Sequence, residues 1–253
     1  MATRPRTVQF GLLLFVFVAM RLVLADEGIH PRTTTRLLDA FEELAGDGPA
    51  PTSDAPDSES PTTSDVQGKL ARATFGSGCF WCTEAVFEEM RGVKQVVSGF
   101  SGGRLPYPTY EQVLTGLTGH AEVVQIEYDP SVVSYKKLLE AFWFTHDPTT
   151  LNRQGVDIGT QYRSVIFFHN KQQRELAELY RQKLNQAKAY RKPIVTQIAE
   201  FEAFYPAKSY HQDYYAQNGR KRYCQTHIRP KVRKFRRIFR DDLKGSDGPE
   251  AES

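Results

Sequence analysis

The sequence predicts an α/β protein of the α+β kind, a ferredoxin-like two-layer sandwich with a central mixed sheet and flanking helices. Segments with strand-like and helix-like patterns follow one another as strand, helix, strand, strand, helix, strand. This is the order of the split βαβ unit, which places its helices on one face of a sheet. The 253-residue chain is 40% hydrophobic and 25% charged, which is an ordinary globular balance.

Strands are expected where β-branched and aromatic residues cluster between turn-forming residues. The clearest case is 121–128, where Val123, Gln125 and Glu127 alternate with apolar neighbours before Asp129-Pro130 breaks the pattern. The expected strands, in chain order, are 71–75, 93–100, 121–128, 162–169 and 193–199.

Helices are expected where apolar residues recur three or four positions apart. Within 79–90 the apolar residues at helical spacing are Phe80, Trp81, Ala85, Val86 and Met90, and Gly92 then acts as a stop signal. The expected helices are 79–90, 110–114, 134–144 and 171–189. The basic stretch 228–240 also has apolar residues at helical spacing, and we interpret it as an amphipathic helix docked on the sheet with a solvated basic face.

Four regions are expected along the chain. Residues 1–25 have a basic start, an apolar run and a small residue at Ala25, which predicts a signal peptide and a secretory or extracellular location. A mitochondrial or plastid presequence and an uncleaved signal anchor are the alternatives. Residues 26–69 are acidic and rich in Pro, Ser and Thr, which predicts a disordered linker with a short helix at 36–43. The globular region is 70–243, and 244–253 is a disordered tail.

Charge and cysteine content exclude several classes of protein. A net charge of +3 is too small to indicate a nucleic-acid partner. Three cysteines are too few for a disulfide-built scaffold, and the odd number leaves at least one of them free.

Cys79 is the first candidate for chemistry because it lies where a glycine-rich strand exit becomes a helix start. Backbone N–H groups and the helix dipole at such a place are expected to lower the pKa of a thiol. A buried cysteine that packs as a small apolar residue is the alternative. Phe80 and Trp81 follow directly and could be either core residues or an apolar cradle beside the thiol.

Cys82 completes a C-x-x-C motif with Cys79, which is typical of thiol redox chemistry or of half a zinc site. The sequence has no second such motif, so we expect no metal. His120, His146 and His211 lack metal-ligand spacing and are expected to be structural.

Several motifs together resemble the A-type peptide methionine sulfoxide reductase family. They occur in the family's order and span about 73–239: Gly78-Cys79-Phe80-Trp81-Cys82-Thr-Glu, Gly99-Phe-Ser-Gly-Gly103, Tyr107-Pro-Thr-Tyr110, Thr118-Gly-His-Ala-Glu122, His146-Asp-Pro148, Asp157-Ile-Gly-Thr-Gln-Tyr162 and Tyr210-His-Gln-Asp-Tyr214.

The resemblance implies thiol-dependent reduction of methionine-S-sulfoxide, free and in proteins, and therefore repair of oxidised proteins. It also implies a catalytic domain with an irregular C-terminal segment, no metal or organic cofactor, and a thioredoxin-like dithiol as external reductant. A monomer is the default expectation.

The resemblance also assigns roles to residues. Cys79 would be the nucleophile, and Glu122 the general acid, with a pKa raised by desolvation under Phe80 and Trp81. Tyr110 and Tyr162 would donate hydroxyl hydrogen bonds to the sulfoxide oxygen, and Asp157 would be a pocket carboxylate. Without the resemblance, the plain interpretation of Glu122 is a solvated residue at the start of a strand.

The thiol that resolves a Cys79 sulfenic acid is left open by the sequence. Cys224 lies in the C-terminal segment, where family members usually place this thiol, and Cys82 is the rival, three residues from Cys79. A relay through both is a third possibility. Two other functions also remain at this point: a silent module that binds oxidised methionine, and a general dithiol–disulfide oxidoreductase that uses Cys79 and Cys82.

Overall fold

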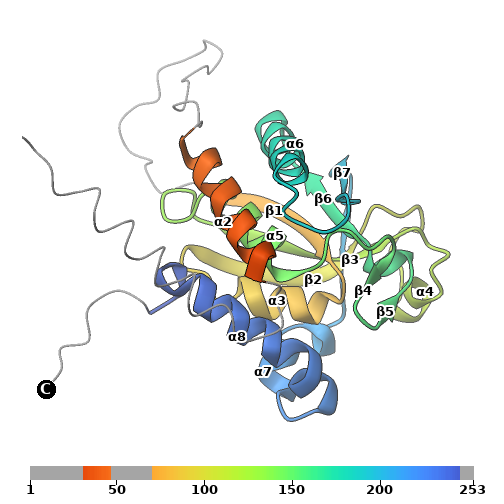
Figure 1. The fold of residues 1–253 in the computed structure, drawn as a ribbon. Coiled ribbons are helices and arrows are strands. Elements are labelled where there is room, and N and C mark those ends of the chain that lie inside the picture. Colours follow the sequence, from red (N-terminus) through yellow and green to blue (C-terminus); the bar gives the residue numbers. More distant parts are fainter. Residues whose placement is uncertain (1–30, 47–69, 246–253) are drawn as a thin grey trace, which may run out of the picture.

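The computed structural model describes residues 31–46 and 70–245, which fold around one six-stranded sheet (Figure 1). Its strands are β1 (Ala71–Ser77), β2 (Val93–Ser101), β3 (Ala121–Tyr128), β6 (Ser164–Phe168), β7 (Gln197–Glu200) and β8 (Phe204–Pro206). They lie in the order β7-β6-β1-β3-β2-β8. The β6–β7 pair is parallel and the other pairs are antiparallel, so the predicted mixed sheet is confirmed.

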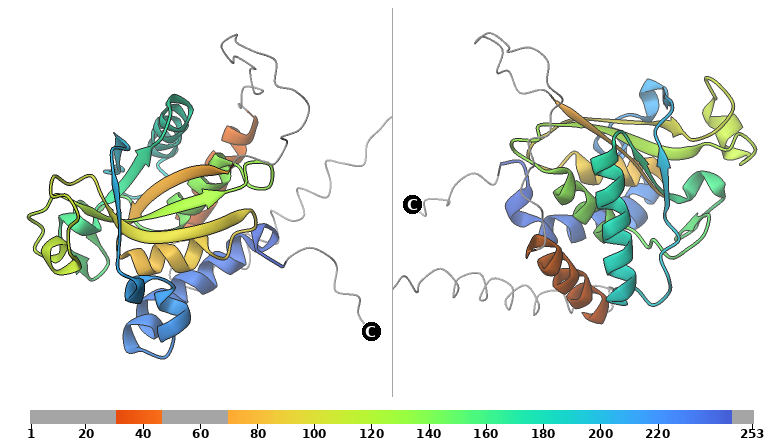
Figure 2. Two further views of the ribbon diagram at one scale, coloured as in Figure 1. Left: turned by 180° about the vertical axis from the view of Figure 1, so that it is seen from behind. Right: turned by 90° about the horizontal axis from the view of Figure 1, so that it is seen from above.

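The helices of the ferredoxin-like unit lie on one side of this sheet (Figure 2). They are α3 (Phe80–Phe87) and α5 (Tyr135–Thr145), accompanied by α6 (Lys171–Gln186). Most of the core lies between these helices and the sheet, around Phe75, Phe142 and Trp143. A smaller cluster around Val123, Val165 and Phe167 covers the opposite face. The predicted two-layer sandwich is therefore confirmed.

Short elements that the sequence patterns do not predict complete the chain. The hairpin β4 (Arg153–Gln154) and β5 (Asp157–Ile158) is followed by a 3₁₀ helix at Thr160–Tyr162, so β6 begins at Ser164 and not at 162. The C-terminal segment is irregular. It comprises β8, a 3₁₀ turn at Ser209–His211, α7 (Tyr214–Asn218) and a π-helical turn at Cys224–Ile228.

The basic stretch forms helix α8 (Arg229–Ile238), with Val232, Phe235 and Ile238 buried. It packs against α3 and α5, so the expectation that it docks on the sheet is wrong. The reason is that α3 and α5 already cover this face of the sheet, which leaves only their outer sides for a further helix.

Helix α2 (Pro31–Gly46) includes the short helix expected at 36–43 but is twice as long and packs on the fold, so the expected disordered linker is wrong over 31–46. Its side chains Leu37, Phe41 and Leu44 are buried, and the Phe41 ring lies 5.6 Å from Phe144 and 5.7 Å from Tyr180. An average over the acidic, proline-rich region conceals this apolar stripe, which has the i, i+4, i+7 spacing of an amphipathic helix.

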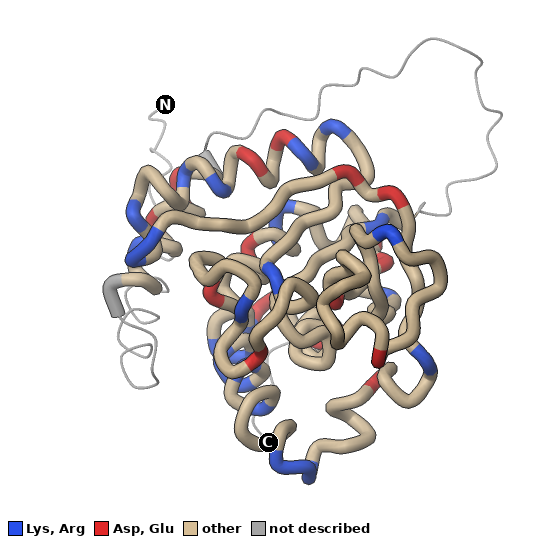
Figure 3. The backbone as a smooth tube through the Cα atoms, turned by 90° about the vertical axis from the view of Figure 1, so that its right-hand side faces the viewer, with Lys and Arg blue, Asp and Glu red and all other residues tan. Residues whose placement is uncertain are grey.

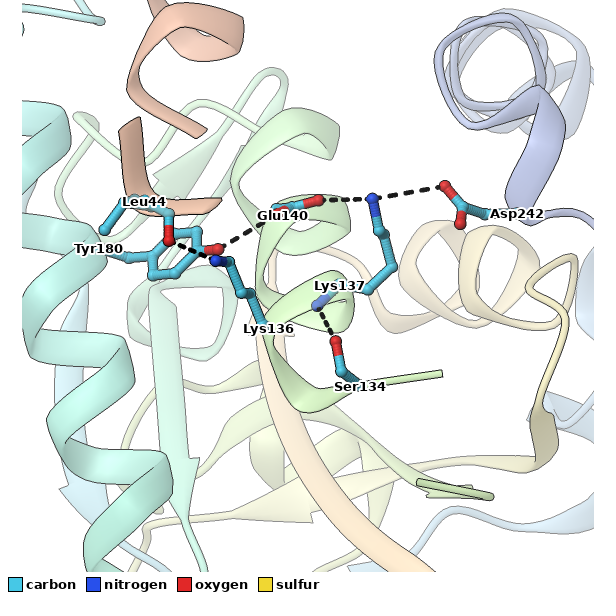
Figure 4. A network of polar contacts seen from close by, with 7 residues as sticks. All are labelled: Leu44, Ser134, Lys136, Lys137, Glu140, Tyr180 and Asp242. Carbon is cyan, nitrogen blue, oxygen red and sulfur yellow. Dashed lines mark hydrogen bonds and ion pairs between the residues drawn. The ribbon is translucent and has the colours of Figure 1, made fainter. Parts of the chain in front are cut away.

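Hydrogen bonds and ion pairs connect helix α5 to α2, to α6 and to the segment around Asp242 (Figure 4). Lys136 donates to the Leu44 carbonyl, and Tyr180 of α6 donates to Glu140 at 3.2 Å. Lys137 pairs with Glu140 at 2.8 Å and with Asp242 at 3.6 Å. Helix α5 therefore connects three segments that are far apart in the sequence.

The signal peptide expected at 1–25 lies outside the described residues, as do 47–69 and most of the expected tail. Lys244 and Gly245 form a turn, in which the Lys244 N–H donates to the Glu89 carbonyl. Within the residues that the structure describes, no helix has the length and apolar character needed to cross a bilayer.

Candidate active site

The site is built around the start of helix α3. Gly78 has φ +95°, and a Cβ there would lie 2.6 Å from the side chain of Gln154, so this position requires glycine. Cys79 follows as the N-cap residue, and its carbonyl accepts the backbone N–H of Cys82 at 3.1 Å. The tight turn from β1 into α3 therefore sets the Cys79 thiol at a helix N-terminus.

Cys79 and Cys82 form a buried pair of hydrogen-bonded thiols. Burial raises the pKa of Cys79 well above its ordinary value, and the hydrogen bond from Cys82 adds to this effect. The same hydrogen bond lowers the pKa of Cys82 to about 7. The expectation that the helix start lowers the pKa of Cys79 is therefore wrong, because loss of hydration outweighs the helix dipole. The pair can therefore lose one proton near neutral pH, and the lower pKa places the resulting charge on Cys82.

Glu122 lies on β3 and is 1% exposed. One of its carboxyl oxygens, Oε2, accepts the backbone N–H of Phe80 at 3.0 Å, so its other oxygen can carry a proton. Burial raises the pKa of this carboxyl to about 8, and the charge of Asp157 adds to the shift. Glu122 is therefore protonated at neutral pH, as a general acid must be.

Tyr110 and Tyr162 come from two separate short elements. Tyr110 is the first residue of α4 (Tyr110–Leu114), whose start is fixed by a capping box between Thr109 and Gln112. Tyr162 ends the 3₁₀ helix. Burial raises the pKa of both phenols, and in both cases the nearby Glu122 is the second cause. Both hydroxyls therefore stay protonated and can donate hydrogen bonds.

Asp157 and Tyr223 close the site from the hairpin and the C-terminal segment. The Tyr223 hydroxyl donates to Asp157 Oδ2 at 3.1 Å, and it lies close enough to Cys79 and Cys82 to lower the pKa of both thiols. Burial, followed by the charge of Cys79, raises the pKa of Tyr223 far above its ordinary range. The sequence analysis did not select Tyr223, although its position directly before Cys224 could have drawn attention to it.

Aromatic rings line the same region. Trp81 stacks on Tyr214 with 3.7 Å between ring centroids and 8° between planes, and Phe80 lies 5.5 Å from His211. His211 also lies 4.4 Å from the Tyr110 ring. The expected apolar cradle of Phe80 and Trp81 is thus completed by two residues, His211 and Tyr214, whose part in it the sequence analysis missed. The density of aromatic residues at 205–215 was the available signal.

Glu84 holds the C-terminal segment against α3. This buried carboxylate accepts the Ser98 hydroxyl at 2.9 Å and the backbone N–H of Tyr214 at 3.2 Å. Burial raises its pKa to about 7. Because Tyr214 stacks on Trp81, Glu84 links the sheet to one wall of the site.

Cys224 is fully buried at the start of the π-helical turn. Burial raises its pKa, and the charge of Cys82 is the second cause. All three cysteines are free. Cys82 is among the groups that shift the pKa of Cys79 and Cys224 is not, while the charge of Cys82 acts on both of the other thiols.

The histidines have structural partners or ring contacts. His120 accepts the Gly103 N–H at 3.1 Å and bonds the Leu105 carbonyl at 2.7 Å, and His146 bonds Ser164 at 2.7 Å. Within 31–46 and 70–245, no group of three His, Cys, Asp or Glu side chains has the arrangement of a metal site.

Comparison with known proteins gives a consistent result. The family model described as peptide methionine sulfoxide reductase matches residues 71–243. Peptide methionine sulfoxide reductase MsrA 1 of Rhodopirellula baltica is 57% identical over 174 residues, covering 69% of this chain and 90% of that protein. MsrA of Saccharolobus solfataricus is 52% identical over 176 residues, covering 70% and 98%.

Solved structures show the same fold. Methionine sulfoxide reductase A of Corynebacterium diphtheriae superposes with a TM-score of 0.55 at 37% identity, covering 61% of this chain and 77% of that one. Reduced Mxr1 from Saccharomyces cerevisiae superposes with a TM-score of 0.56 at 34% identity, covering 64% and 92%.

Proposed function

The chain belongs to the peptide methionine sulfoxide reductase family and is an oxidoreductase that reduces methionine sulfoxide, and we propose that Cys79 is its nucleophile and Glu122 its general acid. The observation that carries this proposal is the geometry at the start of α3. Glu122 accepts the N–H of Phe80, the residue directly after Cys79, and its raised pKa keeps it protonated. Repair of oxidised proteins is the function that follows from the family.

The chemistry has two steps. The Cys79 sulfur attacks the sulfoxide sulfur, its thiol proton passes to the Cys82 thiolate, and Glu122 gives a proton to the oxygen. Tyr110 and Tyr162 donate hydrogen bonds to that oxygen as its charge grows. The S–O bond breaks, the oxygen passes to Cys79, and the products are methionine and a Cys79 sulfenic acid. The phenols and Glu122 come from different elements, so they can surround one oxygen atom. We assign the reaction to the S epimer.

Cys82 is the resolving thiol in this proposal. Its sulfur attacks the sulfenic sulfur of Cys79, the S–O bond breaks, and the hydroxyl leaves as water with the proton that Cys82 received in the first step, which forms the Cys79–Cys82 disulfide. The hydrogen bond between the two sulfurs and the lowered pKa of Cys82 support this assignment over Cys224. Cys224 can then act only as a later thiol in a relay through Cys82.

An external dithiol completes the cycle. We propose a thioredoxin-like protein as this reductant, because a dithiol returns both sulfurs to thiols without a metal or organic cofactor. A monomer without a nucleic-acid partner is the simplest assembly for this reaction. The composition of residues 1–25 supports the secretory pathway as location, with the mitochondrion or a plastid as alternatives. Microscopy of the full chain with a C-terminal fluorescent tag distinguishes these compartments.

The test uses the purified full chain with dithiothreitol and both epimers of a blocked methionine sulfoxide. We expect consumption of the S epimer alone, and loss of activity in Cys79→Ser but not in Cys82→Ser or Cys224→Ser. With thioredoxin as reductant, Cys82→Ser should stop turnover and Cys224→Ser should not. Turnover by Cys79→Ser would overturn the assignment of the nucleophile, and a requirement for Cys224 alone would overturn that of the resolving thiol.

A further inference from the structure

Exposed apolar side chains gather on two segments of the described chain. Of the eleven large apolar residues that are exposed, seven lie within 105–117 and 151–158. The most exposed are Leu117 at 90%, Tyr107 at 86% and Leu151 at 72%. Scattered apolar residues are normal on a protein surface, but a concentration of this kind is typical of a binding surface.

The two segments form one surface at one end of the molecule. The Thr160 hydroxyl, just after the hairpin, donates to the Gly116 carbonyl at 3.2 Å, and the Gln161 amide donates to the Leu114 carbonyl at 3.3 Å. Helix α4 and the β4–β5 hairpin accordingly lie together in two views (Figures 1 and 2). Figure 3 looks onto this end, where most of the backbone belongs to uncharged residues.

This surface is continuous with the active site. The first segment carries Tyr110, and the second carries Asp157 between Val156 and Ile158. These two neighbours are 62% and 67% exposed, so they present apolar side chains to solvent directly beside the partly buried Asp157. Beside α4, a groove is lined by Arg104, Leu105, Gln112, Thr115, Leu117 and Thr118. A polypeptide that presents a side chain to the site between Tyr110 and Asp157 can therefore contact the apolar groups of both segments.

The chemistry of the substrate identifies what covers this surface. Methionine is most often buried among apolar neighbours in folded proteins. Oxidation makes its side chain polar and disrupts such cores, so the oxidised residue becomes accessible together with those neighbours. A free amino acid has no neighbouring side chains to bind there.

We propose that the surface formed by 105–117 and 151–158 binds the apolar side chains that flank methionine sulfoxide in an unfolded segment of a substrate protein. This inference rests on the proposed function and specifies its substrate: an apolar polypeptide is bound better than a polar one or the free amino acid.

The test compares three substrates with dithiothreitol as reductant and the full chain as enzyme. Two are oxidised peptides of equal length, one with leucine and valine around the sulfoxide and one with serine and glycine, and the third is the blocked amino acid. Burial of a few methylene groups gives discrimination of roughly tenfold, so we expect kcat/KM to be about tenfold higher for the apolar peptide. In the double variant Leu117→Lys, Val156→Lys this preference should disappear, while kcat/KM for the blocked amino acid stays within about twofold.

A matched control separates the surface from a general effect of added charge. Val132→Lys changes an exposed apolar residue, 47% exposed, in the loop between β3 and α5, and should keep the peptide preference. Equal kcat/KM for both peptides in the parent, or an equal loss on all three substrates in the double variant, would overturn the inference while the reductase function stands. No turnover of any substrate by the folded parent would overturn the proposed function, and this inference with it.

Discussion

The active-site end and the flank covered by α2 both exclude water, but they bury opposite kinds of groups. At the active site the buried groups are thiols, the Glu122 carboxyl and phenols, whose pKa values are raised by loss of hydration. At the flank they are the apolar side chains Leu37, Phe41 and Leu44 against α5 and α6. Burial therefore tunes acid–base chemistry in one region and stabilises the fold in the other.

The largest effect that tests this contrast is expected for Glu122→Gln. An amide cannot donate the catalytic proton, so kcat/KM should fall by about 10²–10⁴. Because the acid must be protonated, parent kcat/KM should decrease as pH rises through about 8, and this decrease should be absent in the variant. Initial rates across the pH range provide the measurement.

Glu140→Gln is the matched control at the flank. Glu140 is also nearly buried, but it contacts Tyr180 and Lys137 and no reacting group. The kcat/KM of the Glu140→Gln variant should stay within about twofold of the parent value. An equal loss of activity in both variants would show that burial of a carboxyl, and not its place beside Cys79, is what matters.

Phe41→Ala should lower the stability of the fold and leave the activity unchanged, which is the reverse of the effect expected for Glu122→Gln. Removal of this ring from between Phe144 and Tyr180 should lower the free energy of unfolding by about 3 kcal/mol, with kcat/KM unchanged. Denaturant titration measures the first quantity, and Phe41→Leu should recover much of the loss. An unchanged unfolding midpoint would mean that α2 is not part of the cooperative fold.

Tyr223→Phe should have a smaller effect that is confined to the active site. In the parent, the Tyr223 hydroxyl bonds Asp157 and lowers the pKa of both Cys79 and Cys82. The variant has no such hydroxyl. We expect a roughly tenfold loss in kcat/KM, in line with the loss of one hydrogen bond to a charged group. The pKa of thiolate formation, followed by ultraviolet absorbance, should rise. A lower thiol pKa would contradict the hydrogen-bonding role of Tyr223.

The smallest effect concerns the pH dependence of stability. A carboxyl whose pKa is raised in the folded protein contributes stability that is present below its ordinary pKa and is lost as pH rises through the raised value. For Glu84, at about 7, and Glu122, at about 8, this predicts a falling Tm from weakly acidic to weakly basic pH. Glu84→Gln should reduce the change in the free energy of unfolding across this pH range by on the order of 1 kcal/mol, which makes the fall in Tm less steep. An unchanged slope would exclude Glu84 as a source.

Local patterns were sufficient for much of the scaffold. The strand at 121–128 and the helix at 110–114 were predicted with their observed bounds, because strict alternation and a capping Thr109 specify them locally. The hairpin at 153–158 was missed because two-residue strands have no periodic signal. Helix α2 was underestimated because its apolar stripe is interspersed with acidic residues.

The site was less predictable than the scaffold. The motifs selected Cys79, Glu122, Tyr110 and Tyr162, and the structure places these residues around one helix start. Tyr223 and His211 could not be derived from spacing, because their approach to α3 depends on contacts across more than a hundred residues. The pKa of Cys79 was misjudged for a related reason, since the sequence shows the helix start but not the depth of burial.

Helix α2 has a practical consequence for the boundaries of a recombinant fragment. The family match begins at residue 71, so a fragment starting there looks complete by alignment. Such a fragment would lack Leu37, Phe41 and Leu44 and would leave their apolar partners on α5 and α6 open to solvent. Newly exposed apolar area promotes self-association. Solubility and shelf life should therefore depend on a helix that the alignment does not include.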